Sequence, residues 1–200
     1  MPGYFFDFFP SSYKLIDAGF GWRSTMTVAR RLTKYLEQNH AAYDIVFHPY
    51  SEGALKSARN ACIPIQAMVK AIMLRDDRGL ILAAIPAGNR LMLRWINEQQ
   101  HRHFRLAGEY TVLHHFDDCE PGAIPAFGAP WGMTTVCDSS FDIIPDLYLE
   151  SGNHRELIHM TRDEYLRLIG DHPRSHISCS QDDRDGFAPS VIPSLDLLDC

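Results

Sequence analysis

Apolar residues recur along the chain at spacings that change between helical and extended periods. Over residues 24–38 the apolar side chains fall on one helical face, with arginine and lysine at other positions, which predicts an amphipathic helix. Residues 43–48 form a short, partly β-branched run that predicts a strand. Pro49 ends that strand, and Ser51 is placed to cap a second helix in which Ala54, Ala58 and Ala61 recur at spacings of four and three.

The middle of the chain has the pattern of a β-hairpin. Two apolar runs, 69–75 and 80–86, flank a polar turn that ends in Gly79. Thr161 and Glu164 form a capping box ahead of a last helix that reaches Leu168. The remaining elements that we expect are helices over 89–99 and 109–116 and strands over 104–107, 133–137, 147–150 and 157–160.

The order of these elements predicts the fold class and the domain limits. Strands and helices are interleaved without a strict repeat, and a hairpin is present, so we expect an α+β domain with a mixed or antiparallel sheet. Two hundred residues make about one domain. We divide the chain into an aromatic arm (1–20), a folded domain (21–170) and a polar tail (171–200).

Composition and charge exclude several classes of protein. No apolar run approaches the roughly 18 residues of a membrane span, and Asp7 and Pro10 interrupt the aromatic start, so we expect a cytoplasmic protein without a membrane partner. A net charge of -6 argues against a general nucleic-acid coat protein but leaves room for a local basic face. The five cysteines form no CxxC pair, which argues against a disulfide framework or a zinc knuckle.

Lys70 is the first candidate for chemistry, because apolar residues flank it on both sides at the entry to the hairpin. The chain has only four lysines against fifteen arginines. A compact ammonium in this setting suits a phosphate, hydroxyl or carbonyl ligand. The alternative is a lysine whose stem lies along apolar surface while its tip reaches water.

A second candidate is the loop of residues 122–128, in which glycines at both ends bracket Pro125. Such a loop permits close backbone approach to a ligand and amides that bind an oxyanion, although it could equally be shaped for packing alone. The preceding segment carries potential metal ligands but no usual ligand spacing, so we interpret it as a solvated acidic loop; its residues are His114, His115, Asp117, Asp118, Cys119 and Glu120.

Further polar residues lie at predicted element ends, where sites are commonly built. These are His48, Ser51, Asp138, Asn153 and His154. His48 and Ser51 could pair as base and nucleophile, but their spacing across Pro49 is explained more simply by a strand end and a helix cap. We therefore expect no covalent serine mechanism.

The order of these features resembles the YbaK/prolyl-tRNA synthetase-associated domain family, the free-standing relatives of the synthetase editing domain. The resemblance covers about residues 25–170, and its most specific parts are Lys70 and the loop of residues 119–128. It also includes the strand that ends at His48 with Ser51 three residues on, Pro86-Ala87-Gly88 before a helix, Asp138, and Gly152-Asn153-His154.

The resemblance implies a fold, an activity and a set of site residues. The fold would be a curved, mixed, barrel-like sheet surrounded by helices. The activity would be hydrolysis of the ester that links a wrong amino acid to tRNA, with alanine or cysteine on tRNA-Pro as the expected substrate and with no metal or organic cofactor. Lys70 and Gly122 would be catalytic, and the substrate-binding residues would be His48, Ser51, Ile124, Pro125, Asp138, Gly152 and His154.

The expected partner is the acceptor end of a tRNA, and an aminoacyl-tRNA synthetase is a second candidate. A local phosphate-binding face could come from one of two sets of basic residues, either Arg30, Arg31 and Lys34 or Arg90 and Arg94. The oligomeric state stays open.

One position departs from the family pattern. The family loop often reads GxxxP, whereas the residue four after Gly122 is Ala126 and the proline falls at Pro125. Ala126 could change the pocket or mark lost activity. The alternative function is therefore a non-catalytic module that holds tRNA or a synthetase in the same pocket.

Overall fold

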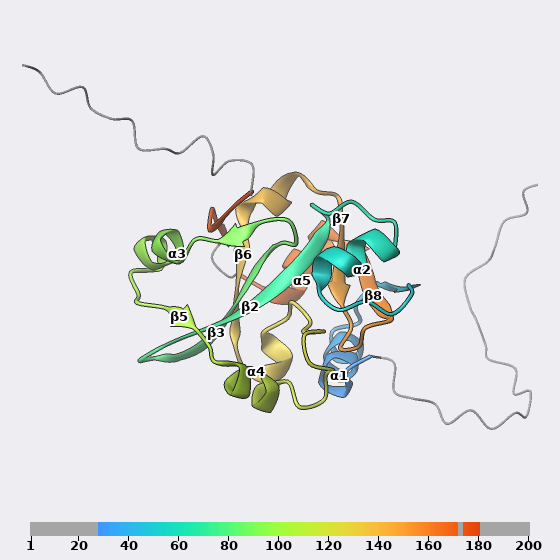
Figure 1. Ribbon diagram of the computed structural model, residues 1–200, viewed down its shortest axis with the longest axis horizontal. Coiled ribbons are helices and arrows are strands. Elements are labelled where there is room, and N and C mark those ends of the chain that lie inside the picture. The colour runs from blue at the N-terminus through green and yellow to red at the C-terminus, as the bar shows by residue number, and fades with distance from the viewer. Residues whose placement is uncertain (1–27, 172–173, 181–200) are drawn as a thin grey trace, which may run out of the picture.

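The computed structural model describes residues 28–171 and 174–180 (Figure 1). Its α-helices are α1 (Arg30–Gln38), α2 (Ala54–Asn60), α3 (Leu93–Gln100), α4 (Glu109–His115) and α5 (Arg162–Ile169), and two 3-10 turns are η1 (Ala129–Trp131) and η2 (Ser139–Ile143). The strands are β1 (Asp44–Phe47), β2 (Met68–Asp76), β3 (Gly79–Pro86), β4 (Arg90–Leu91), β5 (Arg105–Leu106), β6 (Thr134–Asp138), β7 (Asp146–Glu150), β8 (Glu156–Thr161), β9 (Arg174–Ser175) and β10 (Ser178–Cys179).

The strands form a mixed sheet in the order β1-β8-β7-β2-β3-β6-β9, with β5 paired to β2. The predicted hairpin of β2 and β3 lies at its centre, with Lys70 opposite Ile85. Parallel pairings of β2 with β7 and of β3 with β6 extend the hairpin on both sides. The α/β architecture with a mixed sheet is the fold that the sequence predicts.

The larger hydrophobic core covers one face of this sheet. Alternate residues of the hairpin, such as Val69, Met73 and Leu82, point into it, as expected from the two-residue period of a strand. Leu32 and Leu36 of α1 and the buried residues of α5 close this core from outside. In Figure 1, α5 lies behind the central strands.

The opposite face of the sheet carries two smaller clusters. One contains Leu74 and Ile96 and lies under α3, and the other contains Met68 and Ala58 and lies under α2. Figure 1 shows α2 beside the end of β2, on the side of the sheet away from α5. Lys70 leaves this face between Met68 of the α2 cluster and Ile72, which packs against the α3 cluster.

Two local structures that we predict from the sequence are wrong. Ser51 does not cap α2, whose N-cap is Gly53 at φ +88° without a side-chain hydrogen bond, because Ser51 bonds to neighbouring side chains instead. No helix starts at Asn89, because residues 90–91 form β4 with β10, and α3 begins only at Leu93. These bonds come from distant parts of the chain, so local periodicity does not contain them.

The structure gives the elements at both ends of the predicted domain. The first helix, expected from residue 24, runs from Arg30, and residues 24–27 lie outside the described residues, as do the arm of residues 1–20 and the end of the tail from 181 onward. Within the segment expected to be tail, β9 and β10 pair with the domain and the side chain of Ile177 is fully buried. Across residues 28–171 and 174–180, no helix is both long enough and apolar enough to span a bilayer.

Gly128, at the end of the loop of residues 122–128, gives a test of the packing. A Cβ on Gly128 would collide with the carbonyl oxygen of Met133 and with Thr135 Oγ1, whereas a Cβ on Gly108 would meet nothing within 4 Å. We expect Gly128→Ala to lower the free energy of unfolding by about 1–3 kcal/mol in urea titrations, and Gly108→Ala to change it by about 0.5 kcal/mol or less. Equal stabilities for the two variants would contradict the described loop.

Candidate functional site

Lys70 is held by backbone oxygens and not by an acidic side chain. Its Nζ donates to the carbonyl oxygens of Asn89 at 2.8 Å and Ala87 at 3.2 Å, and the side chain is half-buried. Within residues 28–171 and 174–180 it makes no salt bridge. Burial, and to a lesser extent the charge of Arg90, lower the pKa of Lys70 below its ordinary value. Among the described residues, therefore, no carboxylate neutralises the positive charge of Lys70.

The turn after β3, which holds Lys70, is itself held in place by a chain of hydrogen bonds. Asn89 Nδ2 donates to Ser178 Oγ at 2.9 Å, and Ser178 Oγ donates to Asp138 Oδ2 at 2.7 Å. The buried carboxylate of Asp138 also accepts from the amides of Ile177 at 3.1 Å and Ser140 at 2.8 Å. Asp138 thus stands behind Lys70 in a chain of hydrogen bonds, with its oxygens engaged by protein donors.

A second group of polar residues lies where β1, α2 and β7 meet. His48 Nδ1 donates to the carbonyl oxygen of Pro49 at 2.8 Å and lies 3.2 Å from Ser51 Oγ. Ser51 Oγ donates to Ser57 Oγ at 3.1 Å, and Ser57 Oγ donates to Glu150 Oε1 at 2.9 Å. The hydroxyl protons therefore point in sequence toward one buried carboxylate, and Ser51 is not paired as a nucleophile with a free base.

The loop that starts at Gly122 joins the same group through His154. His154 Nε2 donates to the carbonyl oxygen of Pro121 at 3.0 Å, and its backbone amide donates to Glu120 Oε2 at 3.1 Å. A Cβ on Gly122, which has φ +91°, would lie 3.8 Å from His154 Cε1. The His154 carbonyl in turn accepts from the Ser51 amide at 3.1 Å. The structure thus brings Gly122, His154, Ser51 and His48 together.

Gly152 permits close packing at this group of residues, which we call the polar junction and which consists of His48, Ser51, Ser57, Gly122, Glu150 and His154. At φ +108° it adopts a conformation that side chains rarely take, and a Cβ there would lie 2.7 Å from the Ala29 Cβ. Its carbonyl accepts from the Glu120 amide at 2.8 Å, and the Ser151 carbonyl accepts from the Ala29 amide at 2.8 Å. Gly152 therefore allows the turn after β7 to touch both α1 and the acidic loop.

Strand pairing relates Lys70 to this junction. Val69 of β2 is paired with Leu149 of β7 in parallel register, and both side chains enter the larger core. Lys70 and Glu150 follow them, so both leave the opposite face of the sheet, on neighbouring strands. Glu150, like Ser57 and Ser178, is a buried polar residue that the sequence analysis missed; its place two residues after Tyr148 in a strand was the available signal.

The rest of the loop of residues 122–128 packs into the protein. Pro125 and Ala126 are buried, and Ile124 is half-buried against the larger core. The Ala126 carbonyl accepts from the Tyr165 hydroxyl at 2.7 Å, and the Ala126 side chain is fully buried. The departure from the family pattern at this position therefore lies in the core.

Three buried polar atoms at the junction have no hydrogen-bond partner among the described residues: His48 Nε2, Glu150 Oε2 and His154 Nδ1. Because each histidine donates through its other nitrogen, these two ring nitrogens are acceptors in the neutral ring. All three atoms could accept from a water molecule or an ammonium group. Burial raises the pKa of Glu150 to about 7, against a smaller opposing effect of its bond from Ser57.

The acidic segment before the loop is tied to α1. Arg31 Nη2 lies 3.0 Å from Asp117 Oδ1, and its amide donates to Asp118 Oδ2 at 2.9 Å. In the part of the chain that the structure describes, no three histidine, cysteine, aspartate or glutamate side chains are grouped so as to hold a metal ion.

Glu150 gives a prediction about stability and pH. With a pKa of about 7 in the folded state and an ordinary value of 4.5 when unfolded, its protonated form is favoured by folding, so stability falls as the pH rises from 4.5 to 7. This loss is on the order of 3 kcal/mol. We expect Glu150→Gln to remove that part of the pH dependence in urea titrations, whereas Glu98→Gln, on the exposed face of α3, leaves it. If the stability of Glu150→Gln depends on pH as that of the unaltered protein does, the raised pKa of a buried Glu150 is contradicted.

Ser178 gives a prediction about Lys70. Without its hydroxyl, Asn89 loses an acceptor and Asp138 a donor, so the turn loosens and water reaches the ammonium. We expect Ser178→Ala to raise the pKa of Lys70 toward its ordinary value in an NMR titration of the lysine ¹³Cε signals, which four lysines keep simple. Ser178→Thr retains a hydroxyl and should titrate like the unaltered chain. If folded Ser178→Ala keeps the original pKa of Lys70, the hydrogen-bond chain does not affect that pKa and the prediction is contradicted.

Solved structures with the same fold are similar to this chain at low sequence identity. A protein proposed as a trans-editing enzyme for prolyl-tRNA synthetase is 22% identical with a TM-score of 0.66, over 76% of this chain and 97% of the other. A hypothetical protein is 16% identical with a TM-score of 0.67, over 75% and 100%. A larger Marinobacter aquaeolei protein, proposed to act in signal transduction, is 19% identical with a TM-score of 0.62, over 75% and 30%.

No curated protein sequence matches the chain. Residues 43–168, which include Lys70, Gly122, Asp138 and His154, match the aminoacyl-tRNA editing domain. That match spans more than half of the chain and all of β1 through most of α5. The chain therefore belongs to the aminoacyl-tRNA editing domain family.

Proposed function

We propose that this protein is a trans-editing aminoacyl-tRNA deacylase, which hydrolyses the ester between tRNA and a wrongly attached amino acid in the cytoplasm. The observation that carries the proposal is Lys70, a half-buried ammonium on the central strand of an editing domain, held by two carbonyl oxygens and free of any carboxylate among the described residues. A charge held in this way is available to a polar ligand.

Hydrolysis of the aminoacyl ester requires mainly that the protein positions the water and the ester. A water oxygen attacks the carbonyl carbon of the aminoacyl ester, the bond to the ribose oxygen breaks, and that oxygen takes a proton, leaving a free amino acid and an uncharged tRNA. A positive charge or backbone amides directed at the carbonyl oxygen stabilise the charge that develops there. Lys70 and the backbone at Gly122 are the groups we assign to this task.

The polar junction supports the proposal because its acceptors suit the attacking water or the amino group of the substrate. The unpartnered acceptors of His48, Glu150 and His154 suit a water molecule or the ammonium of the aminoacyl group. Because Ser51 is engaged with Ser57, water and not a serine hydroxyl is the nucleophile that we propose. The assigned groups need neither a metal nor an organic cofactor.

For the substrate, we propose tRNA-Pro that carries alanine or cysteine. A structural relative is itself proposed as a trans-editing enzyme for prolyl-tRNA synthetase, and this supports the choice of tRNA. Of the two phosphate-binding faces expected from the sequence, the one with Arg90 has the better support, because Arg90 is close enough to Lys70 to lower its pKa. Arg31, in the other face, is paired with Asp117, and Arg94 of the favoured face is paired with Glu98, so this support rests on Arg90 alone.

The alternative is a module that binds tRNA or a synthetase without catalysis. The residue that first suggested it, Ala126, is buried in the core, so its side chain does not reach the surface of the protein. Binding of a non-hydrolysable 3′-aminoacyl-adenosine analogue without turnover of charged tRNA would select this alternative.

The decisive variant is Lys70→Ala. Loss of the ammonium removes one electrostatic group that stabilises the transition state, so we expect the rate of deacylation of Ala- or Cys-tRNA-Pro to fall by about 100-fold or more. Lys70→Arg keeps a charge but changes its shape and should recover only part of the rate. Circular dichroism checks that both variants are folded. Full activity in folded Lys70→Ala would remove Lys70 from the mechanism.

A further inference from the structure

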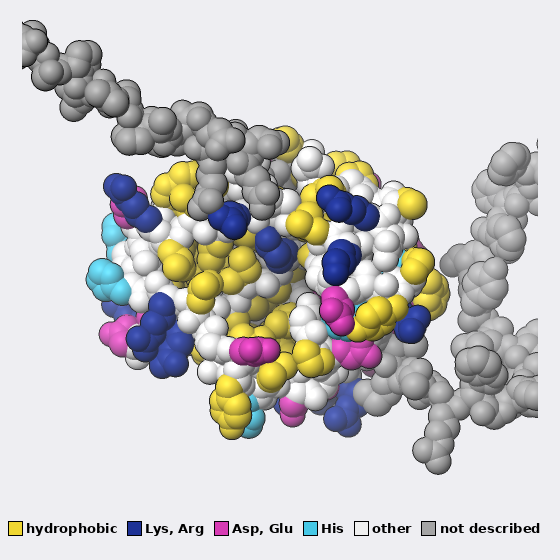
Figure 2. Space-filling view, in the orientation of Figure 1, with side chains coloured by type: hydrophobic (Ala, Val, Ile, Leu, Met, Phe, Trp, Pro, Cys, Tyr) yellow, Lys and Arg dark blue, Asp and Glu magenta, His cyan; other side chains and the backbone are white. Residues whose placement is uncertain are grey.

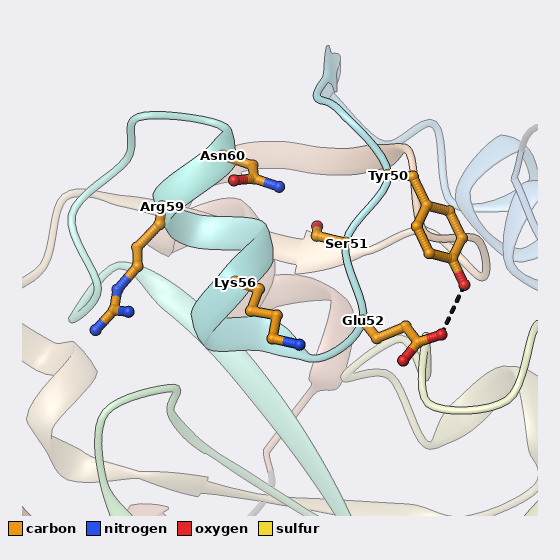
Figure 3. Close-up of a pocket in the computed structure, with 6 residues that line it drawn as sticks. All are labelled: Tyr50, Ser51, Glu52, Lys56, Arg59 and Asn60. Carbon is orange, nitrogen blue, oxygen red and sulfur yellow. Dashed lines mark hydrogen bonds between the residues drawn. The ribbon is translucent and has the colours of Figure 1, made fainter.

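A hollow lies beside the polar junction, between α2 and the segment that precedes it. Its volume is about 480 Å³, and the residues that line it are Tyr50, Ser51, Glu52, Lys56, Arg59 and Asn60. Figure 3 shows the side chains of α2 on one side of this hollow and those of residues 50–52 on the other. Figure 2 shows Lys and Arg side chains at the surface where α2 lies in Figure 1.

Two positive charges of the hollow are unpaired. Lys56 and Arg59 are three residues apart, so they lie on the same side of α2, and both are exposed. Within the described ranges neither makes a salt bridge, whereas Arg94 is paired with Glu98 at 2.7 Å and Arg167 with Glu164 at 2.7 Å. Unpaired cations of this kind are free to bind an anion.

The hollow also carries an exposed aromatic ring. Tyr50 is 50% exposed, and its ring lies 5.3 Å from the ring of His154 and 5.4 Å from the Arg155 guanidinium. Its hydroxyl donates to Glu52 Oε1 at 2.9 Å, which engages the one carboxylate among the lining residues. An aromatic face beside unpaired cations is the combination that binds single-stranded nucleic acid.

Ser51 connects the hollow to the candidate site. It lines the hollow, its hydroxyl belongs to the chain that ends at Glu150, and its amide donates to the His154 carbonyl at 3.1 Å. His154 is in turn next to Gly122. The hollow is thus connected to Gly122 through Ser51 and His154, so an extended polymer whose end reaches Gly122 can lie along it.

We propose that this hollow binds the unpaired nucleotides that precede the terminal adenosine of the tRNA. Lys56 and Arg59 contact their phosphates, and a base stacks on Tyr50. The inference rests on the proposed deacylase function and adds to it a binding site for RNA apart from the groups assigned to the ester.

The test compares two substrates that share the ester and differ in the RNA. Wild type, a Lys56→Ala/Arg59→Ala double variant and a Tyr50→Leu variant are assayed on mischarged tRNA-Pro and on the matching 3′-aminoacyl-adenosine. We expect the double variant to lose about 10-fold or more in kcat/KM on tRNA and to stay within about 2-fold on the small ester. Tyr50→Leu should lose about 5- to 150-fold on tRNA alone, from the 1–3 kcal/mol of one stacked base. Arg167→Ala, which removes an arginine that is paired with Glu164 on α5, is the control and should change neither.

Salt gives an independent readout. Neutralising two phosphates on a single strand contributes about 1.4 to the slope of log affinity against log salt concentration, so the double variant should have a shallower slope by about that amount. Equal kcat/KM for wild type and double variant on tRNA would overturn the proposal. So would an equal loss on both substrates, because that places the two residues in the reaction.

The failure of the deacylase proposal is distinguishable from failure of this one. If wild type hydrolyses neither substrate, binding of a fluorescent oligoribonucleotide ending in CCA is measured by anisotropy. Binding that the double variant loses, and that Arg167→Ala keeps, supports the RNA site without catalysis. Binding that is absent, or equal in all variants, contradicts it.

Discussion

The hydrogen bonds from Lys70 to two carbonyl oxygens are the constraint around which the site is organised. A half-buried ammonium needs acceptors, and in this domain they come from Ala87 and Asn89 in the turn after β3. The turn is held by Ser178, and Ser178 by Asp138, so the end of the described chain and the end of β6 both serve the charge on β2. Because both acceptors are neutral carbonyl oxygens, they stabilise the Lys70 ammonium without neutralising its charge.

The second half of the site depends on how strand ends converge. β1, the turn after β7 and the N-terminal side of α2 meet at one corner of the sheet, and Gly152 permits the close contact with Ala29. The corner buries His48, Ser51, Ser57, Glu150 and His154 together. Parallel pairing of β2 with β7 then places this corner beside the strand that carries Lys70.

The sequence contains the signals for the central elements and for the family, but not for the contacts that assemble the site. Apolar period and turn chemistry predict the hairpin, and Thr161 predicts the start of α5, where its Oγ1 accepts from the Glu164 amide. Ser178 carries no local pattern, and the strand position of Glu150 does not indicate its partner, because the partners of the two residues lie 40 and 93 residues away. For the same reason Ser51 was expected as a helix cap, and Asn89 as the start of a helix. Asp138 was expected at the ligand, but its partners place it behind Lys70.

The most direct test of the central claim is a deacylation panel with the unaltered protein. tRNA-Pro charged with proline, alanine, cysteine or serine, and tRNAs of other specificities charged with alanine, serine or threonine, are incubated with excess protein, and the released amino acid is measured. The account predicts release of alanine or cysteine from tRNA-Pro, with prolyl-tRNA-Pro left intact. No release from any charged tRNA by folded protein would contradict it.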